Sequence, residues 1–226
     1  MKTQKDYIKE LKSYLWENQL SINDYQIERL AHFADLLVKK NQEVNLISRK
    51  DEENIIENHI FISALVTEFL PTNANSFLDI GTGGGIPGIP LAITRPMMKG
   101  VLVDSTGKKI DAVKEFISKL KLSNAIAENS RVESEEFIKQ YQNQFDLIIS
   151  RGTVPMIILF RYAIPLIKNK AYLLAIKGGD IDAEFKTALL KYKPNIKKST
   201  IFELAYKPTN LRNKKGKKLI LLEITK

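Results

Sequence analysis

Apolar residues at helical spacing dominate residues 1–70 of the chain. Stripes that recur every three to four residues predict helices over residues 4–18, about 23–40 and about 51–70. The first two stripes consist of Tyr7, Ile8, Leu11 and Leu15, and of Ile27, Leu30, Ala31, Ala34, Leu37 and Val38. Ser21 or Asn23 can cap the second helix and Asp51 the third. We expect a helical segment over residues 1–70, packed on the rest of the chain because no Gly/Ser-rich linker separates them.

From residue 71 onward, short apolar runs alternate with helical patterns. The runs at residues 77–80, 101–103, 125–128, 145–149 and 171–176 read as buried parallel strands. Residues 196–204 and 218–224 read as two final strands joined by a turn-rich loop. This order predicts an α/β domain over residues 71–226, with an open, doubly wound, mostly parallel sheet of seven strands and one hairpin at its edge.

A glycine-rich turn follows the first expected strand. One carboxylate, Asp79, interrupts that strand, and glycines crowd residues 81–88. Glycine tolerates positive φ and lets a ligand lie against the backbone. Pro87 and Pro90 suit the first turn of a helix, whose free N–H groups favour an anionic group. A strand, a glycine turn and a helix in this order predict a site for a nucleotide-type cofactor.

Two cofactors compete for this turn. Residues 83–88 fit G-x-G-x-x-G, the dinucleotide fingerprint. Residues 79–85 fit D-x-G-x-G-x-G, the pattern of S-adenosylmethionine (SAM) enzymes, in which the acid lies near the methionine amino group. We favour SAM for two reasons. A dinucleotide domain does not require Asp79, and such a domain usually lies at the start of its chain, unlike the turn found here. An ordinary glycine-rich turn without a cofactor is the third interpretation.

A second carboxylate, Asp104, ends the second expected strand. It lies about 20 residues beyond the glycines, where such folds place the acid that holds the ribose hydroxyls. The alternative is that Asp104 caps the next helix. Ser130-Arg131-Val132-Glu133 follows the third expected strand, at the end of the sheet where ligands bind in open α/β folds. Glu133 can cap or precede the helix after it.

Composition narrows the class of protein. The chain has 226 residues with 44% apolar and 27% charged, which is typical of one large globular domain or of one domain with an appendage. No apolar run approaches the ~20 residues of a membrane span, and the N-terminus lacks the apolar core of a signal peptide. We expect a cytoplasmic protein, and a monomer. The absence of cysteine excludes disulfides and thiolate chemistry, and neither histidine has a second ligand at metal-type spacing.

Positive charge is concentrated in the last third of the chain. From Arg151 onward there are 17 Lys and Arg against 5 Asp and Glu, whereas the residues before it have 18 against 21. This asymmetry suggests nucleic acid as partner, although a lysine-rich surface can also serve solubility alone. The candidate RNA-binding residues are Lys177, at the end of the fifth strand, and Arg212, Lys214, Lys215, Lys217 and Lys218 in the loop of the final hairpin.

Several motifs together resemble one family. They are Asn45-Leu46-Ile47-Ser48, the turn from Asp79 to Leu91, Leu102-Val103-Asp104-Ser105 through Gly107-Lys108-Lys109, Ser130-Arg131-Val132-Glu133, Ile149-Ser150-Arg151 and Ile176-Lys177-Gly178. In this order they resemble the small-subunit rRNA guanine-N7 methyltransferases, called RsmG and earlier glucose-inhibited division protein B. The resemblance covers most of the chain from residue 20 onward.

The resemblance implies a class I SAM-dependent methyltransferase that modifies guanine N7 in 16S rRNA, with naked rRNA or the small ribosomal subunit during assembly as its partner. By position, SAM contacts fall at Gly81, Ile86, Asp104, Val132, Glu133 and Arg151, while Ser105 and Thr106 line the adenosine. With Asp79, Gly83 and Gly85 these residues form the predicted cofactor site. The chain departs from the family pattern at three positions. The family usually has tryptophan in place of Lys40, often has an acid in place of Ile62, and usually has alanine in place of Gly152.

The expected chemistry is catalysis by positioning. Guanine N7 has an available lone pair, so no general base is required. The fourth strand ends in Ser150-Arg151-Gly152 and not in the Asn/Asp-Pro-Pro-Tyr/Phe motif of exocyclic-amine methylation. No catalytic residue is assigned, and Arg151 and Lys177 are candidates for placing the base. The alternatives are an NAD-dependent oxidoreductase and a catalytically inactive RNA-binding protein on the same fold.

Overall fold

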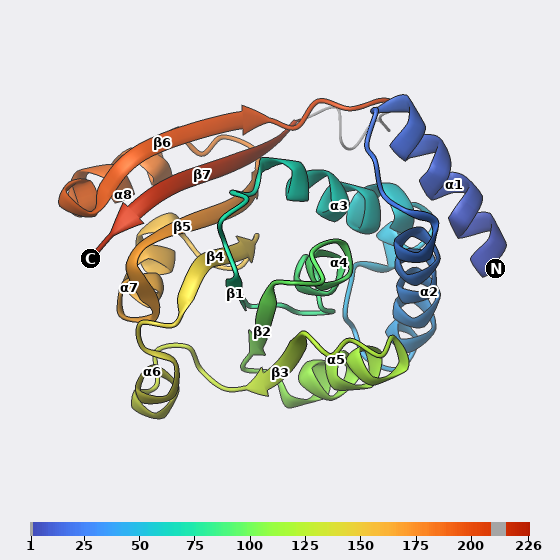
Figure 1. Cartoon of the computed structure of the whole chain (residues 1–226), viewed down its shortest axis with the longest axis horizontal. Coiled ribbons are helices and arrows are strands. Elements are labelled where there is room, and N and C mark those ends of the chain that lie inside the picture. Colours follow the sequence, from blue (N-terminus) through green and yellow to red (C-terminus); the bar gives the residue numbers. More distant parts are fainter. Residues whose placement is uncertain (1, 209–215) are drawn as a thin grey trace.

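The computed structural model describes residues 2–208 and 216–226. In these ranges seven strands form one sheet in the order β3-β2-β1-β4-β5-β7-β6 (Figure 1). The strands are β1 Ser76–Ile80, β2 Lys99–Asp104, β3 Ala125–Asn129, β4 Phe145–Arg151, β5 Ile167–Gly178, β6 Ile196–Glu203 and β7 Lys217–Thr225. Strands β1 to β5 are parallel, and β7 lies antiparallel between β5 and β6. The predicted doubly wound sheet with an edge hairpin is confirmed.

The strand order reverses at β1, which lies between β2 and β4. Asp79 is paired with Leu102 on one side and with Ile149 on the other, so it lies on an interior strand of the sheet. A crevice forms outside the carboxyl ends of the strands at such a reversal, and ligands of open α/β sheets bind there. The ends of β1, β2 and β4 therefore meet at one edge, next to the glycine turn.

Helices cover both faces of the sheet (Figure 1). One face packs with α1 Gln4–Glu17, α2 Asp24–Asn41, α3 Ile62–Val66, α4 Gly88–Thr94 and α5 Gly107–Lys119 in a single hydrophobic cluster. The other face packs with α6 Glu135–Tyr141, α7 Met156–Leu166 and α8 Asp182–Tyr192. Alternate residues of a strand point to opposite faces. Phe77 belongs to the first cluster and Leu78 to the second, which directs Asp79 toward the face that holds α4.

The third helix differs from the expectation. Residues 49–70 form a 3-10 turn, Arg49–Asp51, a π-helical turn, Ile56–Phe61, helix α3 and a second 3-10 turn, Thr67–Phe69. The prediction that Asp51 caps a regular helix is wrong, because the Asp51 carboxylate is buried and accepts a hydrogen bond from the Asn58 side chain at 2.9 Å. Helix α2 is capped by Asn23, and α6 by Ser134 instead of Glu133.

Among the described residues, no helix combines the length and apolar character that crossing a bilayer requires. The division at residue 70 stays a prediction, since the helices before it share one hydrophobic cluster with the sheet.

Candidate functional site

Three glycines shape the turn after β1 by adopting left-handed conformations. Gly81, Gly83 and Gly85 have φ of 70°, 56° and 86°, which residues with a side chain rarely adopt. The N–H groups of Gly81 and Thr82 donate to the Val103 carbonyl, at 2.9 and 3.0 Å. The turn is thereby tied to the end of β2, where Asp104 follows Val103.

The same glycines meet very different surroundings. A Cβ on Gly81 would collide with Thr153, and one on Gly85 would lie 2.6 Å from Ile89 Cδ1. A Cβ on Gly83 would have no described protein atom within 4 Å. Gly81 and Gly85 are therefore small because protein packs against them, whereas Gly83 faces open space in which a ligand can lie against the backbone.

Asp104 joins this turn to the start of α5. Its Oδ2 accepts a hydrogen bond from the Gly83 N–H at 3.0 Å, and its Oδ1 accepts one from the Thr106 N–H at 2.9 Å. The carboxylate is half-buried, and Ser105 and Thr106 beside it are exposed. Each carboxylate oxygen has a further lone pair, so Asp104 can accept from two vicinal hydroxyls while it holds the turn.

Asp79 lies behind the turn with its side chain fully buried. Its Oδ2 accepts hydrogen bonds from Thr82 Oγ1 at 2.7 Å and from the Gly88 N–H at 2.9 Å. Its Oδ1 is buried without a hydrogen-bond partner in the described part of the chain. Burial raises the pKa of Asp79 to about 7, against the lowering effect of the Thr82 and Gly88 hydrogen bonds. An unsatisfied carboxylate oxygen beside a glycine turn fits a cationic group of a ligand.

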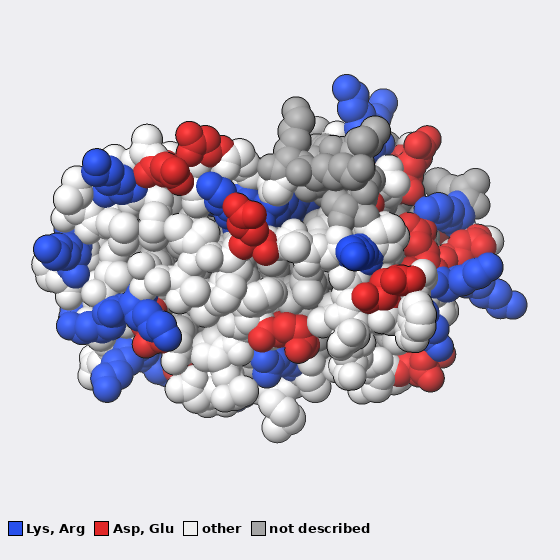
Figure 2. Space-filling view, turned by 90° about the horizontal axis from the view of Figure 1, so that it is seen from above, with Lys and Arg blue, Asp and Glu red and all other residues white. Residues whose placement is uncertain are grey.

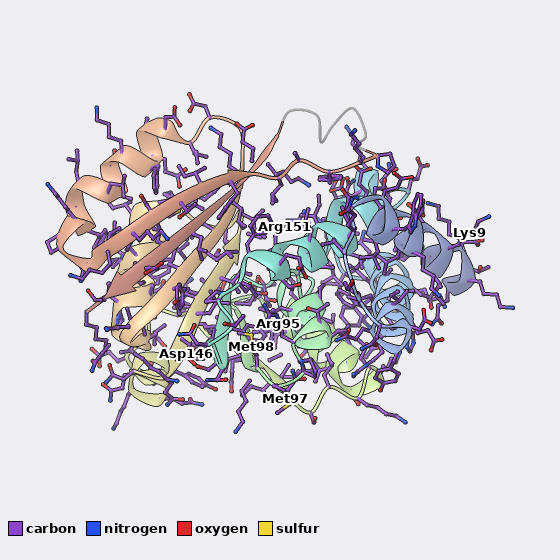
Figure 3. All side chains as sticks on the ribbon, turned by 45° about the horizontal axis from the view of Figure 1, so that its top comes forward. Lys9, Arg95, Met97, Met98, Asp146 and Arg151 are labelled. Carbon is purple, nitrogen blue, oxygen red and sulfur yellow. The ribbon has the colours of Figure 1, made fainter. Side chains whose placement is uncertain are left out.

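Arg151 ends β4 and reaches toward the N-terminal helices. Its Nη2 donates to the carbonyl of Asn58, in the π-helical turn, at 2.7 Å. In Figure 3 Arg151 and Asp146 lie near opposite ends of β4. Ser150 and Thr153 beside Arg151 donate to the Ile80 carbonyl at 3.0 and 3.2 Å. These bonds fix the end of β4 against the end of β1.

The remaining predicted cofactor residues lie around this edge in different environments. Ile86 and Val132 are buried in the two hydrophobic clusters, one on each face of the sheet. Glu133 is exposed, with Arg131 at 3.8 Å. The hydrogen bonds of the turn bring Gly83 and Asp104 together, with Asp79 behind them. The assignments of Val132 and Glu133 to the cofactor site rest on the resemblance alone.

The predicted RNA-binding lysines are less free than the sequence suggests. Lys177 is half-buried, and its ammonium donates to the Val154 carbonyl at 2.6 Å and to Glu184 at 2.9 Å. Lys217 and Lys218 are half-buried, and Lys218 lies 3.7 Å from Asp182. Arg212, Lys214 and Lys215 lie outside the described residues. Figure 2 shows many Lys and Arg side chains at the end of the molecule that carries α8 and β6.

Comparison with known proteins identifies the family to which the chain belongs. The model of a family described as rRNA small subunit methyltransferase G, GidB, matches residues 26–210, which is most of the chain. The chain belongs to the GidB family. The match includes the glycine turn, Asp104 and Arg151, so the candidate site lies within the part of this GidB chain that defines the family.

Curated relatives agree with this membership. A protein named ribosomal RNA small subunit methyltransferase G from Chlorobium luteolum is 41% identical to this GidB chain, over 79% of the chain and 74% of the relative. The relative of that name in Clostridium novyi is 35% identical, over 75% of the chain and 70% of the relative.

Solved structures share the fold at low sequence identity. A SAM-dependent methyltransferase from Aquifex aeolicus has a TM-score of 0.58 and 16% identity, over 83% of this chain and 98% of that one. An O-methyltransferase from Bacillus cereus has a TM-score of 0.59 and 15% identity, over 96% and 100%. The sheet is that of the class I methyltransferases, as the sequence predicted.

Three contributors to the site of this GidB chain were not predicted from the sequence. Thr82 binds the Asp79 carboxylate, Thr153 packs on Gly81, and Asn58 supplies the carbonyl that holds Arg151. The position of Thr82 inside the glycine pattern was a usable signal. Thr153 and Asn58 act across long sequence separations, and a single sequence carries no sign of such contacts.

Proposed function

We propose that this GidB-family chain transfers the methyl group of SAM to N7 of a guanine in 16S rRNA, as naked rRNA or within an assembling small subunit in the cytoplasm. The observation that carries the proposal is the Asp104 carboxylate, which bridges the Gly83 and Thr106 N–H groups beside the open face of Gly83. A carboxylate at the end of β2, next to a glycine backbone with open space beside it, suits an adenosine ribose.

The residues present fit the cofactor. Asp104 would accept from the ribose hydroxyls, and Asp79 Oδ1 would face the methionine ammonium. Gly81, Gly83, Gly85 and Ile86 would shape the backbone wall, while Ser105, Thr106, Val132 and Glu133 would border the adenosine. When bound, SAM supplies an electrophilic methyl group on a sulfonium.

The chain's own part in the reaction is placement. Guanine N7 in an unpaired base exposes its lone pair, so the protein has only to align it with the methyl carbon. Arg151, held by the Asn58 carbonyl, is the candidate for orienting the base. Lys177 can take this role only by leaving Glu184, with which it now forms an ion pair.

The test measures transfer of labelled methyl from SAM to purified 16S rRNA and to small-subunit particles. The labelled site is then mapped by strand cleavage at 7-methylguanosine after borohydride and aniline. Asp104→Ala should bind SAM about 10- to 100-fold more weakly, because a hydrogen bond to a charged group contributes roughly 1.5–3 kcal/mol. Transfer to another atom, or calorimetric binding of NAD in place of SAM, would overturn the proposal.

A further inference from the structure

A second cavity lies outside the candidate cofactor site, between the end of α2 and the first turn of α5. Its volume is about 770 Å³, and it is lined by residues 41–43, 45–49 and Lys109. This volume is within the range of ~300–1,000 Å³ typical of small-ligand sites. The lining includes the Asn45-Leu46-Ile47-Ser48 motif, to which the proposed cofactor site assigns no role.

Buried Asn41 builds this cavity. Its Oδ1 accepts hydrogen bonds from the N–H groups of Leu46 at 2.8 Å and Ile47 at 2.9 Å, and its Nδ2 donates to Glu52 at 2.6 Å. The loop after α2 is therefore fixed from the inside. Leu46 and Ile47 point into the protein, whereas Asn45 and Ser48 remain exposed.

The cavity adjoins the glycine turn. A Cβ on Gly84 would lie 3.2 Å from Leu46 Cβ and 3.5 Å from the Leu46 carbonyl oxygen. The lining also includes Lys109, in the first turn of α5, two residues after Gly107 begins the helix that follows Asp104. The loop of residues 45–49 thus packs against the same turn that the cofactor site uses, from the side of the N-terminal helices.

The charges of the lining favour an anion. Arg49 and Lys109 form no ion pair with any residue that the structure describes. The one acid of the lining, Glu43, pairs with Lys40 at 2.8 Å, and Lys40 also lies 3.1 Å from Glu115. Two cations that line one polar cavity without a carboxylate partner suit a phosphate group.

We infer that this cavity binds a nucleotide of the RNA substrate, with its phosphate facing Arg49 and Lys109 and with Asn45 and Ser48 offering hydrogen bonds. The inference rests on the proposed function for its substrate class. A polymer fits better than a free small molecule because Gln42, Glu43, Asn45, Ser48 and Arg49 are all exposed. This side of the cavity is therefore open to solvent, so an RNA strand can continue past the bound nucleotide.

The test compares two doubly substituted proteins that lose the same charge. Arg49→Ala with Lys109→Ala removes the cations of the cavity. Lys50→Ala with Lys108→Ala removes their exposed chain neighbours, which do not line it. Binding of a 16S rRNA fragment is measured across salt concentrations, and SAM binding is measured by calorimetry on the same proteins.

We expect the cavity variant to bind RNA at least about tenfold more weakly at low salt, with a salt slope reduced by about 0.7 to 0.9 for each phosphate that the protein no longer neutralises. SAM affinity should stay unchanged, and the neighbour variant should resemble the parent. Equal weakening in both variants would assign the effect to general charge. A weaker affinity for SAM would assign the cavity to the cofactor site. Either result, or an unchanged RNA affinity, overturns the inference.

Asn45→Ala separates nucleotide contact from charge, because it should raise the dissociation constant for the RNA fragment without altering the salt slope. Far-UV circular dichroism and urea unfolding confirm that each variant is folded. Since RNA binding is measured without turnover, the two proposals fail separately. If the unsubstituted protein binds RNA through the cavity but transfers no methyl group, only the proposed function is contradicted.

Discussion

Asp79 combines full burial with one hydrogen-bonded and one unsatisfied oxygen among the described residues. Its pKa is about 7 in the folded chain and 3.8 for an ordinary aspartic acid, with desolvation as the first cause. Between these values the folded state binds more protons than the unfolded state. The free energy of unfolding therefore falls as pH rises from about 4 to about 7, and this contribution is level above that range.

Asp79→Asn should remove this pH dependence. Relative to the parent, the variant should gain stability as pH rises from 5 to 8, as measured by urea unfolding at each pH. His59, whose pKa burial lowers to about 4, contributes the opposite slope below its ordinary value of 6.5. That contribution is common to both proteins and cancels in the comparison. A constant difference between parent and variant would contradict the burial of an ionisable Asp79.

Gly83 and Gly85 should fail in different ways when each is replaced by alanine. Both have positive φ, but only at Gly85 does the new methyl group meet protein, namely Ile89. Gly83→Ala should lose roughly 1–2 kcal/mol of stability from the left-handed backbone, and most of its SAM affinity. Gly85→Ala should lose more stability.

Urea unfolding and calorimetry with SAM measure these two effects. Gly216→Ala is the matched control, since it has a φ of 77°, no described protein atom within 4 Å of an added Cβ and a position outside the turn. We expect it to lose stability without losing SAM affinity. If Gly83→Ala binds SAM like this control, the open face of Gly83 is not the cofactor's wall.

At the level of elements, the π-helical turn of residues 56–61 connects the N-terminal helices to the end of β4. It presents the Asn58 carbonyl to Arg151, while the Asn58 side chain donates to buried Asp51. π-Helical turns are rare and frequently accompany functional sites. Here the turn fixes the direction of Arg151, which the sheet alone does not determine.

Asp51→Ala should weaken this connection. The change leaves the Asn58 amide without this buried acceptor, which costs roughly 1–3 kcal/mol of stability. Because Asn58 would shift, methyl transfer should slow while SAM affinity is retained. Glu53→Ala, an exposed acid two residues away, is the control for charge. Urea unfolding and single-turnover transfer measure the two effects, and unchanged transfer would separate Arg151 placement from Asp51.

The elements differ in how far the sequence predicts them. The strands with buried apolar runs, such as residues 145–149, lie where the pattern places them because burial on both faces demands continuous apolar residues. The helix expected to begin at Asp51 fails because the Asp51 carboxylate is buried and accepts from the Asn58 side chain, while the Asn58 backbone carbonyl accepts from Arg151, 93 positions away. Local capping rules contain no information about such partners.

The site shows the same limit. Asp79 and Asp104 are found by spacing, because their partners lie within the turn or one strand away. Lys177 is found as a charge, but its pairing with Glu184 depends on how α8 packs beside β5. The cavity beside residues 45–49 depends on α2 and α5 meeting in space, which no local pattern predicts.

For the whole molecule, the parallel sheet brings the predicted cofactor residues to one edge, and the N-terminal helices pack on the same turn. In the proposed reaction the protein holds the two substrates in place, and no titrating group has to move a proton. With enzyme saturated by both substrates, the single-turnover rate of methyl transfer should stay nearly flat from about pH 6 to about pH 9.

SAM affinity should depend on pH where the rate does not. In the free protein Asp79 has a pKa of about 7, and only its ionised form attracts the cationic cofactor. Binding should therefore tighten as pH rises from about 6 to about 7.5, and it should release protons. The release is detected as a binding enthalpy that varies with the ionisation enthalpy of the buffer. Asp79→Asn should bind SAM more weakly and without this slope. The decisive measurement is calorimetry across pH beside single-turnover rates. A bell-shaped rate profile would require a catalytic acid or base, and a SAM affinity independent of pH would place the cofactor's positive charge away from Asp79.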